Sequence, residues 1–271
     1  MSSVAFEEGG AYQSLQAVLQ NAFGVVVGDE RQQTITAMLK PVLSDYSFSS
    51  LEELASALEK GDSGNLRNSV LQAITTHEDH WFSPQELNTL VDGYLVPDML
   101  GSGKDQYRIW VISSNGGQLP YSLAMKLKDA APAVNVTIDA TDISEEVVKQ
   151  AETGLYDEAS MNGMDAESRK KYMHEQDEQW RVNDDIRSMV SFSTCNLLDG
   201  FEERGHYDLI ICLDGLVYFS LAIKNMLLDS FAKLLDPSGI LVPGVNDPML
   251  PMNENFERVQ HEAGTFYRQK S

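Results

Sequence analysis

Apolar residues recur at three- and four-residue spacing from about Tyr12 to Trp81, as they do along one face of an α-helix. Four stretches have this spacing, and they begin at Leu15, Ile35, Leu51 and Leu66. Turn-forming residues separate the stretches, at Gly24, Gly28, Pro41, Ser44, Gly61 and Gly64. The pattern predicts an all-helical N-terminal domain over residues 1–97.

The pattern changes after Asp98, where short apolar runs begin to alternate with helical stretches. The runs cover 109–112, 134–138, 190–192, 209–212 and 240–242, and the helical stretches cover 121–127, 145–152 and 222–235. This alternation is typical of a parallel, doubly wound α/β sheet that binds ligands at the carboxyl ends of its strands. Residues 98–271 are therefore expected to form a Rossmann-like domain. Residues 156–180 fit no strand of the series, so an inserted subdomain is expected over 155–190.

The charge of the chain narrows the choice of partner. Its 41 acidic and 20 basic residues give a net charge of −21 and a pI of about 4.4, which disfavours binding to nucleic acid or to an anionic membrane. No apolar stretch is long enough for a spanning helix and no secretory leader is recognisable, so we expect no membrane insertion and a cytoplasmic location. The acidic segment 142–185 is either a partner surface or a solvated face.

The few cysteines and histidines give no metal motif. Cys195 and Cys212 each lie beside a predicted strand, so they are expected to be small buried hydrophobic residues and not a disulfide or a metal pair. His77 and His80 are three residues apart on an expected helix, a weak signal that a solvated helix end explains better. The prediction is that the chain binds no metal.

The most informative stretch is RIWVISSNGGQLPYSLAM, Arg108 to Met125, in which an apolar run leads through a glycine turn into a helix. In the turn, Asn115, Gly116 and Gly117 would let backbone N–H groups approach a ligand closely. Asp142 ends the next predicted strand, where a carboxylate can accept both hydroxyls of a ribose. Asp142 could equally cap the helix that follows it.

Several further motifs follow in order: VTIDATDIS, VSFSTCNLLD, YDLIICLDGLVYFS and LLDPSGILVPG. Together with ITTHEDHWFSPQ upstream, they resemble the chemotaxis receptor glutamate methyltransferases, the CheR family, over nearly the whole chain. The resemblance implies an S-adenosylmethionine-dependent methyltransferase fold with an N-terminal helical domain and a small inserted β-subdomain. It also implies binding of S-adenosylmethionine or S-adenosylhomocysteine and methyl transfer to a glutamate carboxylate of a receptor helix.

The resemblance assigns roles to particular positions. Asp142 matches the ribose-binding acid, Asn196 and Leu197 match the adenine-contact pair, and Tyr218 matches the active-site tyrosine. The residues expected to bind the cofactor are Asn115, Gly116, Gly117, Asp142, Asn196, Leu197 and Asp214.

Other matched positions depart from the family. Leu119 replaces the acid that pairs with the cofactor's ammonium group, and Ser83 replaces an arginine beside its carboxylate. Leu213 and Asp214 replace a further arginine and an asparagine. Because charge-assisted hydrogen bonds contribute roughly 1.5–3 kcal/mol each, these losses would weaken binding many-fold.

The leading hypothesis is therefore a degenerate, inactive or nearly inactive relative that acts by binding or regulation, with a protein partner in a chemotaxis or motility complex. The alternative is an active S-adenosylmethionine-dependent methyltransferase of protein carboxylates with an altered pocket and acceptor. A sensor of adenosine-like nucleotides is a third possibility.

The expected docking surfaces also differ from those of the family. On the second N-terminal helix, Thr36 and Met38 occupy places where the resemblance expects basic residues. The resemblance implies that the inserted subdomain docks a receptor tail by strand addition. Trp180 to Val182 and Ile186 to Phe192 could supply the exposed edge, although a surface hairpin without a partner explains the segment equally well.

Overall fold

The computed structural model describes residues 2–61, 64–75, 80–213, 215–216, 218–244 and 253–270. The chain divides into two compact units, one of residues 1–76 with 216–226 and one of residues 77–215 with 227–271. Residues 77–97, which the hydrophobic pattern groups with the N-terminal helices, belong to the second unit. No helix in the described part of the chain is both long and apolar enough to cross a membrane.

The first unit is helical. Its elements are α1 (Ser2–Phe23), η1 (Asp29–Arg31), α2 (Gln32–Asp45), α3 (Leu51–Glu59), α4 (Gly64–Thr75) and the first turns of α11 (Leu221–Leu234). Fully buried leucines and isoleucines at the predicted spacing form its core, among them Leu15, Ile35, Leu54 and Ile74. Pro41 lies inside α2 and does not end it, contrary to the predicted punctuation.

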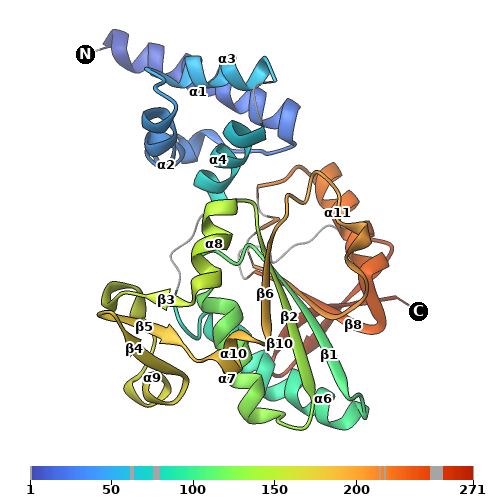
Figure 1. Cartoon of the computed structure of the whole chain (residues 1–271). Helices are drawn as coiled ribbons and strands as arrows, with labels where there is room; N and C mark the ends of the chain where they lie inside the picture. Colours follow the sequence, from blue (N-terminus) through green and yellow to red (C-terminus); the bar gives the residue numbers. More distant parts are fainter. Residues whose placement is uncertain are drawn as a thin grey trace. The chain divides into compact units, whose positions relative to one another are not determined.

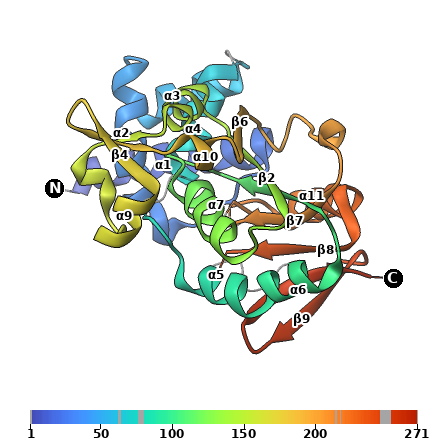
Figure 2. The same ribbon diagram turned by 60° about the horizontal axis from the view of Figure 1, so that its bottom comes forward.

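The second unit contains a seven-stranded sheet of order β6-β2-β1-β7-β8-β10-β9 (Figure 1). The five parallel strands are β1 (Gln106–Ile112), β2 (Asn135–Asp142), β6 (Val190–Thr194), β7 (Tyr207–Cys212) and β8 (Leu235–Pro243). Two antiparallel strands, β9 (Phe256–His261) and β10 (Gly264–Gln269), complete the sheet and lie beside α5 (Gln85–Leu90) and α6 (Val96–Ser102) in Figure 2. The predicted Rossmann-like fold is confirmed.

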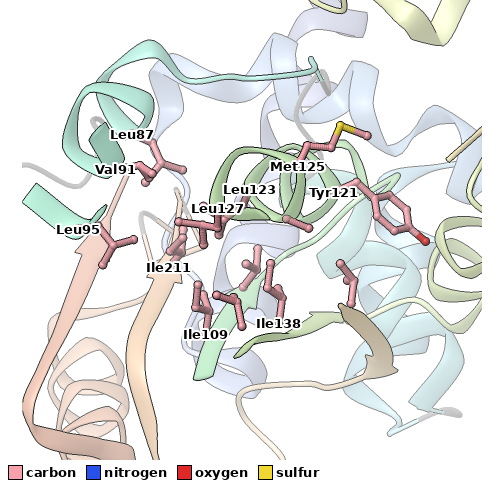
Figure 3. Close-up of a cluster of buried hydrophobic side chains, with 14 of the residues drawn as sticks. Leu87, Val91, Leu95, Ile109, Tyr121, Leu123, Met125, Leu127, Ile138 and Ile211 are labelled. Carbon is pink, nitrogen blue, oxygen red and sulfur yellow. The ribbon is translucent and has the colours of Figure 1, made fainter. Parts of the chain in front are cut away.

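Apolar helix faces cover one side of this sheet. The helices are α7 (Gln118–Ala130), α8 (Glu145–Thr153), α10 (Asp184–Arg187) and the run of α5, η2 (Val91–Leu95) and α6. Side chains from α5, η2 and α7 meet Ile109, Ile138 and Ile211 of the strands in one core (Figure 3). This packing fixes where α7 begins relative to the strand ends.

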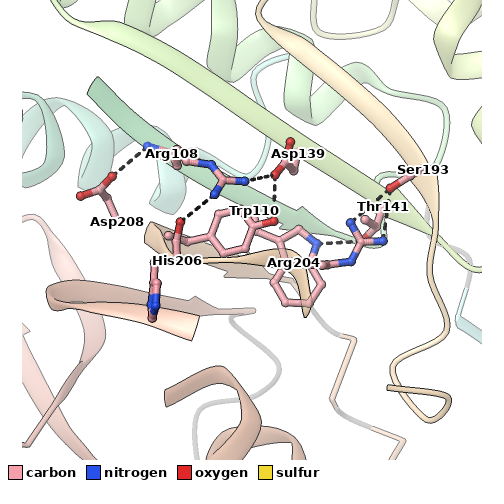
Figure 4. Close-up of polar contacts among 9 residues, drawn as sticks. Arg108, Trp110, Asp139, Thr141, Ser193, Arg204, His206 and Asp208 are labelled. Atoms are coloured by element: carbon pink, nitrogen blue, oxygen red, sulfur yellow. Dashed lines mark hydrogen bonds and ion pairs between the residues drawn. The ribbon is translucent and has the colours of Figure 1, made fainter. Parts of the chain in front are cut away.

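The other face of β1, β2 and β6 carries polar side chains that pair with one another. The Arg108 guanidinium donates to Asp139 at 2.8 Å, Trp110 Nε1–H donates to Thr141 at 2.9 Å, and Arg204 donates to Ser193 (Figure 4). Because these groups satisfy one another, they stabilise the sheet and leave its carboxyl ends as the place for a ligand.

The expected insertion is a small three-stranded antiparallel sheet of order β3-β5-β4. It comprises β3 (Leu155–Tyr156), η3 (Glu158–Met161), α9 (Ala166–Tyr172), β4 (Met173–Gln176) and β5 (Gln179–Val182). The strand that contains Trp180 to Val182 is the central one, so the prediction that it forms an exposed edge was wrong. Its edges are β3 and β4. Of Ile186 to Phe192, residues 190–192 belong to β6 of the main sheet.

Candidate functional site

The expected nucleoside-binding residues meet at one edge of the main sheet. Asp142 is the last residue of β2 and pairs with Thr194 at the end of β6, while Ile112 of β1 pairs with Thr141. The three carboxyl ends are therefore level. The glycine turn follows β1 and Asn196 follows β6, so the topology brings these segments together around Asp142.

The glycine turn has an unusual backbone. Ser113, Asn115 and Gly117 all have positive φ angles, of 60°, 44° and 92°. A left-handed non-glycine residue costs about 1–3 kcal/mol and is found most often at ligand and active sites. Two of them within one short turn are typical of a backbone shaped to meet a ligand.

Asp142 ties this turn to the next one. Its side chain is buried, with 5% exposed, and its two oxygens accept the N–H groups of Asn115 at 3.0 Å and Ser144 at 3.1 Å. Ser144, and not Asp142, caps α8, because its Oγ accepts the N–H of Val147. The capping role considered for Asp142 is therefore wrong.

The loop after β6 is held to the same place. The N–H of Cys195 donates to the carbonyl of Asp142 at 2.8 Å, and the side chain of Asn196 accepts the N–H of Leu198 at 3.0 Å. Asn196 is half-buried and Leu197 is buried. Burial raises the pKa of the Cys195 thiol, which keeps this cysteine protonated and unreactive at neutral pH.

Two buried polar atoms at the start of α7 lack hydrogen-bond partners. They are Oγ of Ser114 and Oε1 of Gln118, whose side chains are 1% and 6% exposed. A buried acceptor without a donor costs about 1–3 kcal/mol, and such an atom beside a strained turn is a candidate ligand contact. The burial of Ser114 is not predictable from the sequence, because serine is mostly an exposed residue type.

The positions of the missing charged groups are apolar or locked. Leu119, the second residue of α7, packs against the hydrophobic core. Ser83 is half-buried and directly follows two residues that are held by hydrogen bonds. The N–H of Phe82 donates to Ser122 of α7 at 2.9 Å, and Trp81 Nε1–H donates to the carbonyl of Ser160 at 2.9 Å. No charged side chain replaces the expected acid at 119 or arginine at 83.

Tyr218 belongs to the first unit. Its hydroxyl oxygen accepts a hydrogen bond from Arg31 at 2.9 Å, and the same guanidinium lies 4.7 Å from the centre of its ring. The N–H of Val26 donates to its carbonyl. The structure therefore holds Tyr218 to the segment before α2, whereas Asp214 lies outside the described residues. The role of Tyr218 in a reaction stays a prediction.

A separate pocket of about 260 Å³ lies at the carboxyl ends of β7 and β8. Its apolar walls come from the two strand ends and from α5 with the residue before it, and comprise Pro84, Leu87, Leu90, Leu213, Val242 and Pro243. Glu86, Arg258 and Thr265 also line it and are exposed. Most of these residues are far apart in the sequence and come together only through the fold.

Within the described residues, no group of three or more histidine, cysteine or acidic side chains has the arrangement of a metal site.

Comparison with known proteins identifies the family. Residues 80–265 match the family described as CheR methyltransferase, SAM binding domain. The chain is 30% identical to a chemotaxis protein methyltransferase of Vibrio parahaemolyticus, and the alignment covers 96% of each protein. It is also 30% identical to chemotaxis protein methyltransferase 1 of Vibrio cholerae and 29% identical to chemotaxis protein methyltransferase 1 of Pseudomonas aeruginosa, over 96% of this chain in both cases. The alignments cover 96% of the Vibrio cholerae protein and 97% of the Pseudomonas aeruginosa protein. The chain therefore belongs to the CheR methyltransferase family.

Proposed function

We propose that this protein acts in a chemotaxis or motility system by binding or regulation, with methyl transfer lost or weak. The observation that carries the proposal is the packing of Leu119 against the hydrophobic core, at the position where the family resemblance expects an acid. A leucine side chain has no charge and no hydrogen-bond acceptor, so it cannot pair with an ammonium group.

The residues present suit one half of S-adenosylmethionine better than the other. Asp142, the turn at Asn115 to Gly117 and the loop at Asn196 would hold the nucleoside. Bound S-adenosylmethionine supplies an electrophilic methyl group on its sulfonium sulfur. At the amino acid end, Leu119 and Ser83 offer neither of the charges that would orient this group. Since small displacements of aligned reactants are costly, transfer would be slow even if the nucleoside is bound.

A second candidate is an active methyltransferase of protein carboxylates with an altered pocket. It is favoured by the two buried acceptors without partners, Ser114 Oγ and Gln118 Oε1. These neutral oxygens could accept N–H donors of a ligand in place of the missing acid. Such contacts are about half as strong as charge-assisted ones.

The surface of α2 supports a changed partner. A groove of about 570 Å³ is lined by Gln32, Gln33, Thr36 and Ala37 of this helix, with Lys40 as the one basic residue among its lining residues. With a net charge of −21, this surface would attract an acidic receptor helix only weakly. The partner proposed is a protein of the chemotaxis or motility complex.

A transfer assay tests the proposal. Purified protein, labelled S-adenosylmethionine and chemoreceptor cytoplasmic fragments from the same genome should give methyl incorporation at least a thousandfold below that of an active relative. The methyltransferase of Pseudomonas aeruginosa with its own receptors is the positive control. Turnover within tenfold of that control would refute the proposal and favour the altered enzyme.

A further inference from the structure

The pocket of about 260 Å³ at the carboxyl ends of β7 and β8 is not explained by the proposed function. None of its lining residues is among those expected to bind S-adenosylmethionine, and all of them belong to the second unit. Sites for drug-sized ligands commonly enclose about 300–1,000 Å³. A pocket of this size therefore suits a smaller molecule.

The inner wall of the pocket is apolar. Leu87 and Leu90 of α5 are 6% and 3% exposed, and Val242 near the end of β8 is 5% exposed. Leu213 adds a half-buried apolar side chain directly after β7. An apolar group that enters the pocket leaves water, so the affinity should rise with each methylene group that is buried.

Two side chains of opposite charge also line the pocket. Glu86 lies four residues before Leu90 on α5, so these two residues share one side of the helix. Arg258 of β9 is paired with Tyr267 of β10, so their side chains lie on the same face of the sheet. Glu86 and Arg258 are exposed, and they are the only charged residues among the described lining residues.

Neither charge is neutralised by the protein. Within the described part of the chain, the carboxylate of Glu86 and the guanidinium of Arg258 form no ion pair and no hydrogen bond, with each other or with another residue. The exposed Glu158 of the insertion differs, because it pairs with Arg169 at 3.0 Å. A ligand between the apolar wall and these two charges would partly shield its own charges from water and so strengthen both contacts.

We infer that this pocket binds a small zwitterion with an apolar side chain, namely a free aliphatic amino acid such as leucine. The ammonium group pairs with Glu86 and the carboxylate pairs with Arg258. The aliphatic side chain contacts Leu87, Leu213 and Val242. Because the two charges of the pocket cancel, a ligand with only one charge gains one contact and meets repulsion from the other side chain.

This inference goes beyond the proposed function and does not depend on the binding of S-adenosylmethionine or of a nucleoside. It is also tested separately, because amino acid binding and methyl incorporation are different measurements.

Calorimetric titration of the whole protein tests the inference with four probes: leucine, glycine, 4-methylpentanoate and 3-methylbutylamine. Glycine lacks the apolar group of leucine, 4-methylpentanoate lacks its ammonium group, and 3-methylbutylamine lacks its carboxylate. Leucine should bind about tenfold or more tightly than each of the other three probes. Binding of 4-methylpentanoate or 3-methylbutylamine as tight as that of leucine, or no binding of leucine at millimolar concentration, overturns the inference.

Two variants at the charged positions give a second readout. Arg258→Gln should weaken leucine binding by about tenfold and should not weaken 3-methylbutylamine binding. Glu86→Gln should weaken leucine binding by about as much and should not weaken 4-methylpentanoate binding. The matched controls are Lys233→Gln and Glu257→Gln, which make the same changes of charge at exposed positions outside the pocket lining and should leave leucine affinity unchanged. Leucine affinity that survives both pocket variants, or that falls equally in the controls, overturns the inference.

Discussion

Two residues, Leu119 and Ser83, occupy positions where the family resemblance expects charged side chains. Leu119 is packed on the core and Ser83 lies in a segment held by Trp81 and Phe82. Both side chains are only partly buried, so a charged replacement at either position is expected to fit without moving the backbone.

The double variant Leu119→Glu with Ser83→Arg should therefore raise the affinity for S-adenosylhomocysteine by about tenfold to several hundredfold. Two charge-assisted contacts at roughly 1.5–3 kcal/mol each correspond to a gain of about a hundredfold to ten-thousandfold, and the loss of the Leu119 contacts with the core is expected to cancel part of it. Calorimetry measures the change, with each single variant as a control. Unchanged affinity in a folded double variant would mean that these positions do not face the ligand.

For single residues, the sequence shows which expected charges are replaced more readily than it shows which polar atoms lack a partner in the fold. The replaced charges are visible because matched motifs give each position an expected residue type. The unpaired atoms of Ser114 and Gln118 are not visible, since hydrogen-bond satisfaction depends on the packing of α7 against β3, α8 and β6. The same holds for the role of Asp142, where the sequence left two possibilities open and the capping hydrogen bond of Ser144 removed one.

Among the elements, the turn between β1 and α7 depends most on one glycine. A Cβ atom on Gly117 would lie 2.8 Å from the hydroxyl of Tyr156, which itself donates to the carbonyl of Gly116. The turn, the insertion and α7 are therefore packed together around a position without a side chain.

Gly117→Ala should lower the free energy of unfolding by about 1–3 kcal/mol, because alanine is strained at this φ and must displace Tyr156. Chemical denaturation measures the loss. The matched control is Gly101→Ala, in α6, where nothing lies within 4 Å of the added methyl and the helix propensity of alanine predicts a small gain. Equal stability of the two variants would contradict the strained geometry of the turn.

The insertion is held by ionised acids. Hydrogen bonds from Trp180 and Arg169 keep the pKa of Glu158 below its usual range, and bonds from Ser168 do the same for the pKa of Asp165. Because the folded-state pKa values are lowered, these groups stabilise the fold above their unfolded values of about 4 and lose that contribution as the pH falls through the folded values.

Hydrogen exchange in β4 and β5, corrected for its intrinsic pH dependence, should therefore rise between about pH 5 and pH 3. Glu158→Gln should weaken part of this pH dependence of exchange, whereas Glu146→Gln, at an exposed position of α8, should not change it. An identical pH response in wild type and Glu158→Gln would show that the acid does not hold the insertion.

The type of each element was easier to predict from the sequence than the order of the strands in the insertion or the end of α2. Three of the parallel strands follow from apolar runs that are wholly buried, 109–112, 209–212 and 240–242, whereas β6 is buried only at Val190. The order of the strands within the insertion does not follow from the sequence. These strands have two to four residues and no clear alternation, and β5 is central only because it pairs with both β3 and β4. Pro41 does not end α2, because burial of Leu39 and Val42 stabilises the helix on both sides of it.

In the whole molecule, the first unit combines residues 1–76 with residues 216–226. The second stretch is fixed to the first by several contacts, including a β-bridge between Val25 and Phe219 and the bond from Arg31 to Tyr218. The strand-to-helix connection that carries Tyr218 is therefore part of the helical unit, although the surrounding sequence belongs to the Rossmann-like unit.

This arrangement sets an order of events during synthesis. Chains emerge from the ribosome amino end first and tend to fold in units as they appear. The N-terminal helices here cannot complete their unit at that stage, because Tyr218 and Phe219 are translated only after most of the sheet. The helical unit can thus be completed only after translation has passed beyond β7. A nascent chain stopped before residue 216 would expose Val25 and Arg31 without their native partners, Phe219 and Tyr218.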